Sequence, residues 1–241
     1  MNQPAPGLQE NYSGTFHLAI KDGSFRSARR TWPVVLAAAS APASVVDIGC
    51  GLGTWLAALR EIVPACEVTG VDHPGVTKAD LLIPPDRFVG RDLTTPIDLG
   101  RRFDLCLSLE VAEHLAPDHG PGFVRSLVQQ SDNVLFSAAV PGQGGQSHLN
   151  EQWPSYWVEQ FAGHGYRCFD FIRPAIWKDR DIECCYRQNI LFFTKRDLQL
   201  EPGRQNWHGA DLVHPELFFI QHRSTLPRTF TNLVRFLTKR L

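Results

Sequence analysis

The chain has 241 residues, of which 43% are hydrophobic and 20% are charged. This length accommodates one full α/β domain with accessory ends, or at most two small domains. The 24 basic and 25 acidic residues give a net charge of −1, which does not indicate a broad electrostatic surface for nucleic acid. The first ten residues form no apolar signal core, and no apolar run is long enough to span a bilayer. Six cysteines without a Cys-x-x-Cys pair predict reduced thiols and a cytoplasmic protein.

Residues 12–39 have a pattern that predicts one or two helices leading into a first strand. Strands and helices then alternate. The predicted strands are Ser44–Cys50, Glu67–His73, Arg87–Leu93, Phe103–Leu109, Asn133–Val140, Arg167–Ile172 and Arg187–Thr194. The predicted helices between them are Thr54–Val63, Val111–Leu115, Gly122–Gln130 and Pro154–Gly163. Because Arg173–Tyr186 has no strong helical pattern, we expect a hairpin-like, antiparallel finish.

The strands contain apolar runs without alternation, such as Val134–Phe136, which are typical of strands buried on both faces. Strands of this kind that alternate with helices predict the α/β class. We expect a Rossmann-like, doubly wound sheet of seven mostly parallel strands, with an antiparallel last strand and helices on both faces.

The segment Val45–Thr54 is predicted to be a buried strand that ends in a glycine-rich turn and opens a helix. Its glycines allow the backbone to turn sharply and approach a ligand closely. A dinucleotide-binding turn would have a further glycine where Thr54 stands. Asp47 would repel a pyrophosphate but suits a ligand with a positive amino group. A nicotinamide dehydrogenase is therefore disfavoured.

Two further acids end predicted strands. Asp72 closes the second strand, where it can accept hydrogen bonds from ribose hydroxyls. Asp92 closes the third strand, where it can accept from an adenine amino group. Together with the glycine turn, these acids predict a nucleoside pocket.

These motifs, in this order, resemble class I S-adenosylmethionine-dependent methyltransferases. The matching segments are VVDIGCGLG from Val45, GVD from Gly70, RDL from Arg91 and FDLCLSLEVAEHL from Phe103. The resemblance covers roughly residues 40–195 and implies S-adenosylmethionine as the cofactor. It implies that Asp47, Gly49 and Gly51 line the methionine end of the cofactor. It also implies that Asp72 binds the ribose and that Asp92 and Leu93 frame the adenine. Leu109 and Glu110 are implied to border the sulfonium.

The loop after the fifth predicted strand, residues 141–151, is rich in glycine and polar side chains. In a doubly wound sheet this loop lies at the edge where ligands bind. Its His148 is the candidate general base, because the ordinary pKa of histidine lies near neutrality. Glu110, beside the expected sulfonium, is the second catalytic candidate.

A divalent-metal site is a related hypothesis. Glu110, Glu113 and His114 have the spacing of one face of a helical turn, and His148 would complete a set of four ligands. This set resembles that of small-RNA terminal O-methyltransferases, and a similar E-x-x-E-H occurs in ubiquinone-pathway O-methyltransferases. The resemblance implies Mg²⁺ or Mn²⁺, which would lower the pKa of acceptor hydroxyls. Since related sequences also occur in metal-free members, the alternative is a set of polar groups on a short helix.

Aromatic residues follow this loop on the helix predicted over Pro154–Gly163. We expect Trp157 to pack in the core, whereas Trp153 and Tyr156 are candidates for an acceptor pocket. The N-terminal lead-in is a candidate lid, through Tyr12, His17 and Arg26.

Three segments are expected in the chain: a helical lead-in or lid at 1–39, the methyltransferase domain at 40–200, and an extension at 201–241 with an amphipathic helix. After Gln221 the extension has five basic residues and no acid. Its apolar residues recur at helical spacing from Phe230 to Leu241. The helix is expected to pack on the domain or in a homodimer, and the alternative is a membrane-surface helix.

The expected activity is methyl transfer to a hydroxyl of a small molecule, either a sugar-containing compound or a secondary metabolite. Methylation of an RNA terminal ribose is an alternative, but the core has no basic run that would favour nucleic acid. N-methyl transfer is a second alternative within the enzyme class. A non-catalytic adenosylmethionine-binding protein would belong to a different class.

Overall fold

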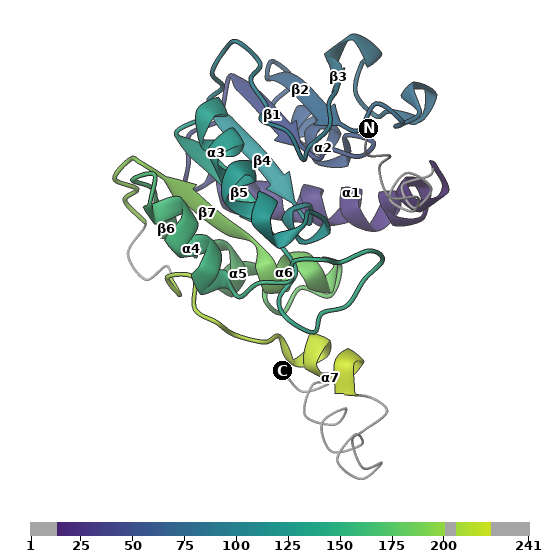
Figure 1. Ribbon diagram of the computed structural model, residues 1–241. Coiled ribbons are helices and arrows are strands. Elements are labelled where there is room, and N and C mark those ends of the chain that lie inside the picture. The colour runs from purple at the N-terminus through teal and green to yellow at the C-terminus, as the bar shows by residue number, and fades with distance from the viewer. Residues whose placement is uncertain (1–13, 201–205, 223–241) are drawn as a thin grey trace.

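The computed structural model describes residues 14–200 and 206–222 (Figure 1). The strands are β1 (Ser44–Ile48), β2 (Glu67–Asp72), β3 (Phe88–Gly90), β4 (Leu105–Leu109), β5 (Asn133–Ser137), β6 (Arg167–Phe169) and β7 (Leu191–Thr194). The α-helices are α1 (Gly14–Leu36), α2 (Thr54–Ile62), α3 (Gly120–Gln130), α4 (Pro154–Ala162), α5 (Ile172–Ile176), α6 (Cys184–Asn189) and α7 (Pro215–His222). Short 3₁₀ helices are η1 (Lys78–Asp80), η2 (Pro85–Arg87), η3 (Ala112–His114) and η4 (Pro117–His119).

The seven strands form one sheet in the order β3-β2-β1-β4-β5-β7-β6. Strands β1 to β5 pair in parallel, whereas β7 runs antiparallel to both of its neighbours. Central strands such as β4 are buried along their whole length, as expected when helices cover both faces. This arrangement confirms the predicted fold class.

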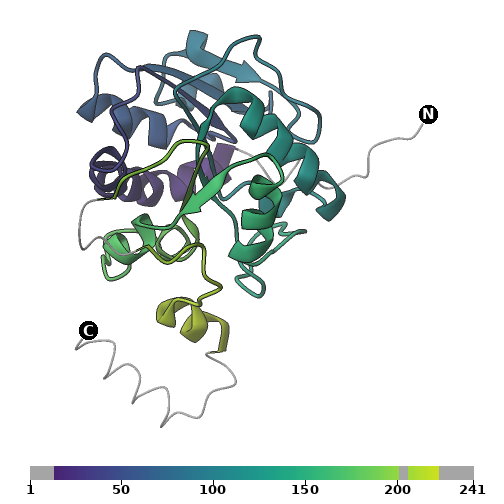
Figure 2. The ribbon, with the colours of Figure 1, turned by 90° about the vertical axis from the view of Figure 1, so that its left-hand side faces the viewer.

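Helices lie on both faces of the sheet (Figure 2), and an apolar core lies between the sheet and the helices on each face. On one face, α1, α2 and α5 contribute Trp32, Trp55 and Ile172 to the core. On the other face, α3 and α4 contribute Phe123, Trp157 and Phe161. Trp157 is buried, which confirms its predicted core position.

Several predicted boundaries are wrong around the last strands. The strand expected at Arg187–Thr194 begins only at Leu191, because the preceding residues belong to α6. Arg173–Tyr186 contains helical residues of α5 and α6, so β6 and β7 are antiparallel neighbours without being a hairpin. Each helix has fewer than two turns, too short for a clear helical period. Similarly, Val111–Leu115 forms only the 3₁₀ turn η3.

The N-terminal and C-terminal segments are described in part. Helix α1 packs its buried side chains into the same core as α2, so it is an integral layer of the fold. Helix α7 lies beyond α6, away from the sheet (Figure 1). The amphipathic helix expected after residue 222 lies outside the described residues. Within the described chain, no helix has the length and apolarity needed to cross a membrane.

Candidate active site

A cavity of about 1080 Å³ opens at the carboxyl ends of β1, β2 and β4. The strand order reverses direction between β1 and β4, which is where ligands bind in doubly wound sheets. Helix α1, helix α6 and the loop after β5 complete the walls. All seven predicted cofactor residues line this one cavity: Asp47, Gly49, Gly51, Asp72, Asp92, Leu93 and Leu109.

The glycine turn after β1 has a backbone that other residues could not adopt without strain. Gly49 has a φ of 86°, and a Cβ atom added there would lie 2.3 Å from Cγ2 of Val111. The Gly51 N–H donates to Oδ2 of Asp72 at 2.6 Å, which joins the turn to the end of β2. The sequence therefore places the backbone of this turn at the cavity wall.

Asp47 is buried at this wall. Burial, together with the nearby charge of Asp72, raises the pKa of Asp47 to about 7. A ligand ammonium group at this position would restore the ionised form of the carboxyl group. Asp72 itself accepts hydrogen bonds from the N–H groups of Gly51 and His73.

Asp92 is exposed at the rim of the cavity. Its Oδ1 accepts hydrogen bonds from the N–H and the hydroxyl of Thr94, at 2.9 and 2.7 Å. These two bonds lower the pKa of Asp92, so the side chain is a carboxylate with one oxygen turned to its own loop. The other oxygen is the one that remains for a ligand.

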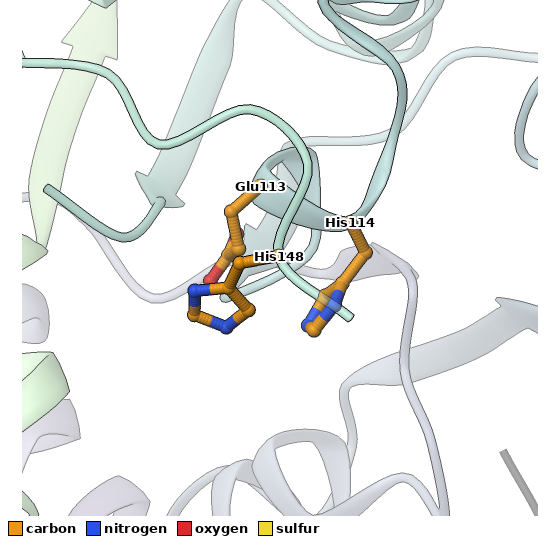
Figure 3. Close-up of side chains that lie close together, drawn as sticks. All are labelled: Glu113, His114 and His148. Atoms are coloured by element: carbon orange, nitrogen blue, oxygen red, sulfur yellow. The ribbon is translucent and has the colours of Figure 1, made fainter. Parts of the chain in front are cut away.

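Three predicted metal-site residues come together in the lining of the same cavity (Figure 3). Glu113 and His114 come from η3, and His148 comes from the loop after β5. One ligand atom from each lies within 4.8 Å of the others. The rings of His114 and His148 have centroids 4.9 Å apart at an angle of 84°.

Glu113 is fully buried, and neither of its carboxyl oxygens has a hydrogen-bond partner among the described residues. Burial and the neighbouring Glu110 raise the pKa of Glu113 well above its usual value. Burial and the proximity of His148 lower the pKa of His114 to about 4. The site thus combines the neutral imidazole of His114 with a buried carboxyl group that forms no salt bridge among the described residues.

Glu110, the expected fourth ligand, is a neighbour of these residues but does not belong to the group whose ligand atoms all lie within 4.8 Å of one another. It adopts a φ of 56°, so residues 110–114 do not form the helical turn that the spacing predicted. The Asn189 amide donates to both of its oxygens, at 3.0 and 3.2 Å, and the Gln143 amide donates at 3.1 Å. Burial raises the pKa of Glu110. Its carboxyl group therefore connects the loop after β5 to α6.

The loop after β5 is held by Glu151. Oε1 of Glu151 accepts from the Gly144 N–H at 2.7 Å and lies 2.9 Å from Nδ1 of His148. Oε2 accepts from the Gly142 N–H at 2.7 Å. Burial raises the pKa of Glu151, but these hydrogen bonds outweigh it and leave the pKa lowered. Glu151 is therefore ionised at neutral pH.

The methyltransferase-domain family model matches residues 24–173. This range includes the glycine turn, Asp72, Asp92 and the residues of η3. The chain belongs to the methyltransferase-domain family. This match confirms the class that the motifs predicted, with S-adenosylmethionine as the cofactor. No curated protein matches this methyltransferase in sequence.

Several solved structures share the methyltransferase fold at low sequence identity. The sugar N-methyltransferase KedS8 from Streptoalloteichus sp. is 16% identical, with a TM-score of 0.58 over 82% of this chain and 96% of that one. Human N-acetylserotonin methyltransferase, in complex with S-adenosylmethionine, is 16% identical, with a TM-score of 0.54 over 81% of this chain. The methyltransferase domain of bacterial CtHen1 is 21% identical, with a TM-score of 0.51 over 69% of this chain and 97% of that one. This chain spans only 61% of the human enzyme and 57% of the similarly folded TnmH.

The structure adds residues that the motifs did not reveal. Gln143, Glu151 and Asn189 reach the site from positions that carry no recognisable spacing in the sequence. By contrast, Trp153 and Tyr156 are not among the residues that line the cavity, which counts against their expected role in an acceptor pocket. Arg26 does line it, whereas Tyr12 and the side chain of His17 lie outside the described residues.

Proposed function

We propose that this methyltransferase transfers a methyl group from S-adenosylmethionine to a hydroxyl of a small molecule, either a sugar-containing compound or a secondary metabolite. One observation carries the proposal: a single cavity joins the predicted cofactor residues to Glu113, His114 and His148. Its volume of about 1080 Å³ is at the upper limit of the roughly 300–1,000 Å³ usual for ligand sites. This size supports joint occupancy by cofactor and acceptor.

The proposal assigns the cofactor to the β1–β2 side of the cavity. Asp47 would accept from the methionine ammonium group, and the Gly49 and Gly51 backbone would lie against the methionine end. Asp72 would bind the ribose. The adenine would lie between Asp92 and Leu93, and Leu109 would border the sulfonium. Their shared position on the cavity wall supports these roles.

A divalent metal, Mg²⁺ or Mn²⁺, is the second part of the proposal. A buried carboxylate without a partner is costly, and the two oxygens of Glu113 have none within the described chain. The adjacent imidazoles of His114 and His148 provide the other ligands of a mixed nitrogen and oxygen site. Glu113, His114 and His148 would therefore hold the ion, while Glu110 remains bound to Asn189 and Gln143.

When bound, the metal would act as a Lewis acid that lowers the pKa of the acceptor hydroxyl. The sulfonium already provides the leaving group, so the protein contributes mainly position. The methyl group would move from sulfur to the acceptor oxygen and leave S-adenosylhomocysteine, while the hydroxyl proton would pass to Nε2 of His148 or, if Nε2 binds the metal, to solvent. Nδ1 of His148 is in contact with Glu151, so only Nε2 can interact with a ligand. Nε2 can be a metal ligand or the general base, but not both at once.

The decisive experiment offers S-adenosylmethionine with hydroxylated sugars, phenols, amino sugars and RNA with a free terminal ribose, and locates the new methyl group by NMR. We expect S-adenosylhomocysteine and an O-methylated small molecule. EDTA should abolish turnover and Mg²⁺ or Mn²⁺ should restore it. His148→Ala should lower turnover about 100-fold or more while it retains cofactor binding.

Each competing function has its own outcome in this experiment. Full activity in EDTA would overturn the metal, and methylation of nitrogen or of RNA would overturn the small-molecule hydroxyl. Unchanged turnover in His148→Ala would exclude both roles given to this residue. Cofactor binding without turnover on any acceptor would favour a non-catalytic adenosylmethionine-binding protein.

The proposal also includes a cytoplasmic location and a homodimer. All six cysteines are free thiols in the structure, which supports the proposed cytoplasmic location. The proposed homodimer would use the C-terminal segment, most of which lies outside the described residues. Size measurements on the full chain would test it.

A further inference from the structure

The loop of residues 141–151 is fixed to the rest of the site at its C-terminal end. The N–H groups of Leu149 and Asn150 donate to the carbonyl oxygen of Glu113, at 2.7 and 3.0 Å. This contact places the preceding residue, His148, beside Glu113 and His114. The backbone therefore sets where the imidazole lies, but it does not set which ring nitrogen carries the hydrogen.

Glu151 supplies that missing constraint. Its carboxylate accepts from two backbone N–H groups, those of Gly142 and Gly144, so the side chain is held in place before it meets any ligand. The third contact is with Nδ1 of His148, at 2.9 Å. Both oxygens of Glu151 already accept from backbone N–H groups, so the contact with His148 is best satisfied when Nδ1 carries the hydrogen and donates it to Oε1. Nε2 then has its lone pair available.

The loop also packs Gly145 closely against the His148 ring. A Cβ atom added at Gly145 would lie 2.2 Å from Nε2 of His148, a distance that no side chain could tolerate. Glycine at this position therefore allows the His148 ring to lie where it does. In Figure 3, the rings of His148 and His114 extend toward the same side, and both residues line the cavity.

We propose that Glu151 is a positioning residue that fixes the tautomer and orientation of His148, so that Nε2 is the atom presented to a metal or to an acceptor hydroxyl. A carboxylate or carbonyl behind a working imidazole is a general device for this purpose. The part of this inference that has Nε2 meet a metal or an acceptor hydroxyl rests on the proposed function. The tautomer itself depends only on the contacts within this loop.

The test compares the wild-type chain with Glu151→Gln and Glu151→Asp. In the glutamine variant, an amide replaces one oxygen, so at least one of the three donors faces another donor. In the aspartate variant, the carboxylate is retained but is shorter. Glu159→Gln is the matched control, because Glu159 is exposed on α4. Binding of S-adenosylhomocysteine, which should change less than twofold, shows that each variant is folded.

The first readout is ¹⁵N NMR of the histidine rings without metal, with His148 assigned by its loss in His148→Ala. We expect the Nδ1–H form in the wild type and in the control, a mixture in Glu151→Gln, and partial recovery in Glu151→Asp. The second readout is Mn²⁺ affinity by calorimetry, which should fall 10- to 100-fold in Glu151→Gln.

An unchanged His148 tautomer in Glu151→Gln would overturn the inference, whether or not the wild-type protein binds Mn²⁺. If wild-type protein binds no Mn²⁺ but the tautomer shifts as expected, the metal hypothesis fails while the role of Glu151 stands. Should Glu151→Gln fail to fold, Glu151→Asp decides: it must show a weaker Nδ1–H preference than the wild type, and a preference equal to the wild type contradicts the inference.

Discussion

At the scale of single residues, two buried acids face the cavity from different walls. Asp47 and Glu113 both have raised pKa values because burial disfavours their charged forms. Neither is paired with a basic side chain in a described salt bridge. The ionised form of such a buried carboxyl group is unfavourable without a cation and becomes favourable when a cation binds beside it. We therefore expect both acids to couple stability to ligand binding.

Asp47→Asn tests this coupling. The pKa of Asp47 is about 7 in the folded protein and 3.8 in an unfolded chain. At a pH between these two pKa values, the folded state therefore binds one more proton than the unfolded state. Stability should consequently fall as pH rises from about 4 to 7, by the order of 4 kcal/mol at most. At pH 8 we expect Asp47→Asn to unfold at a higher temperature than the wild type, yet to lose most of its affinity for S-adenosylhomocysteine.

Thermal unfolding and calorimetry at pH 5 and pH 8 measure both effects. Asp86→Asn is the control, since the Asp86 side chain is largely exposed and should change neither property. Cofactor affinity that is unchanged by Asp47→Asn would show that Asp47 does not meet the ammonium group.

At the scale of elements, α1 forms a wall of the site. The indole N–H of Trp32 donates to the carbonyl oxygen of Trp55 at 3.0 Å, which joins α1 to α2. The Ser24 hydroxyl lies 2.8 Å from that of Thr54 and 3.1 Å from that of Tyr186. Helix α1 thus connects the helix that follows the glycine turn to α6.

Trp32→Ala should loosen this wall. Loss of a fully buried tryptophan costs about 3–5 kcal/mol in unfolding free energy, because a cavity remains. We also expect weaker S-adenosylhomocysteine binding, since α1 lines the cavity. Urea denaturation and calorimetry measure the two effects. Trp153→Ala, at a half-exposed position before α4, should cost under about 1 kcal/mol; an equal cost would contradict the packing role of Trp32.

The elements also show where prediction from sequence succeeds. The buried runs at β1, β2 and β4 and the glycine turn have strong local signals, so the sheet and the part of the cavity wall formed by the glycine turn were predictable. Helix α6 was missed because its six residues run directly into the apolar strand β7. The left-handed backbone of Glu110 and its contact with Asn189 arise from tertiary packing, which no local pattern encodes.

At the scale of the whole molecule, the cavity walls come from segments between Ile20 and Tyr186. A ligand that contacts all of them stabilises only the complete fold. S-adenosylhomocysteine at 100 times its Kd should add about 2.7 kcal/mol of stability, which corresponds to a Tm rise of roughly 5–10 °C for a protein of this size.

Differential scanning fluorimetry checks this prediction, with adenosine as the comparison ligand. Adenosine lacks the methionine portion that Asp47 is proposed to bind, so its effect at equal concentration should be smaller. No Tm change with S-adenosylhomocysteine would contradict the assignment of the cavity to the cofactor.

The position of β7 also has a consequence for the order in which the molecule assembles. Because β7 lies between β5 and β6, β6 has no strand to pair with until β7 has been synthesised. Asn189 of α6, which binds Glu110, directly precedes β7 in the chain. During translation the parallel strands can therefore pair first, while the contact between Asn189 and Glu110 forms only when this late segment leaves the ribosome.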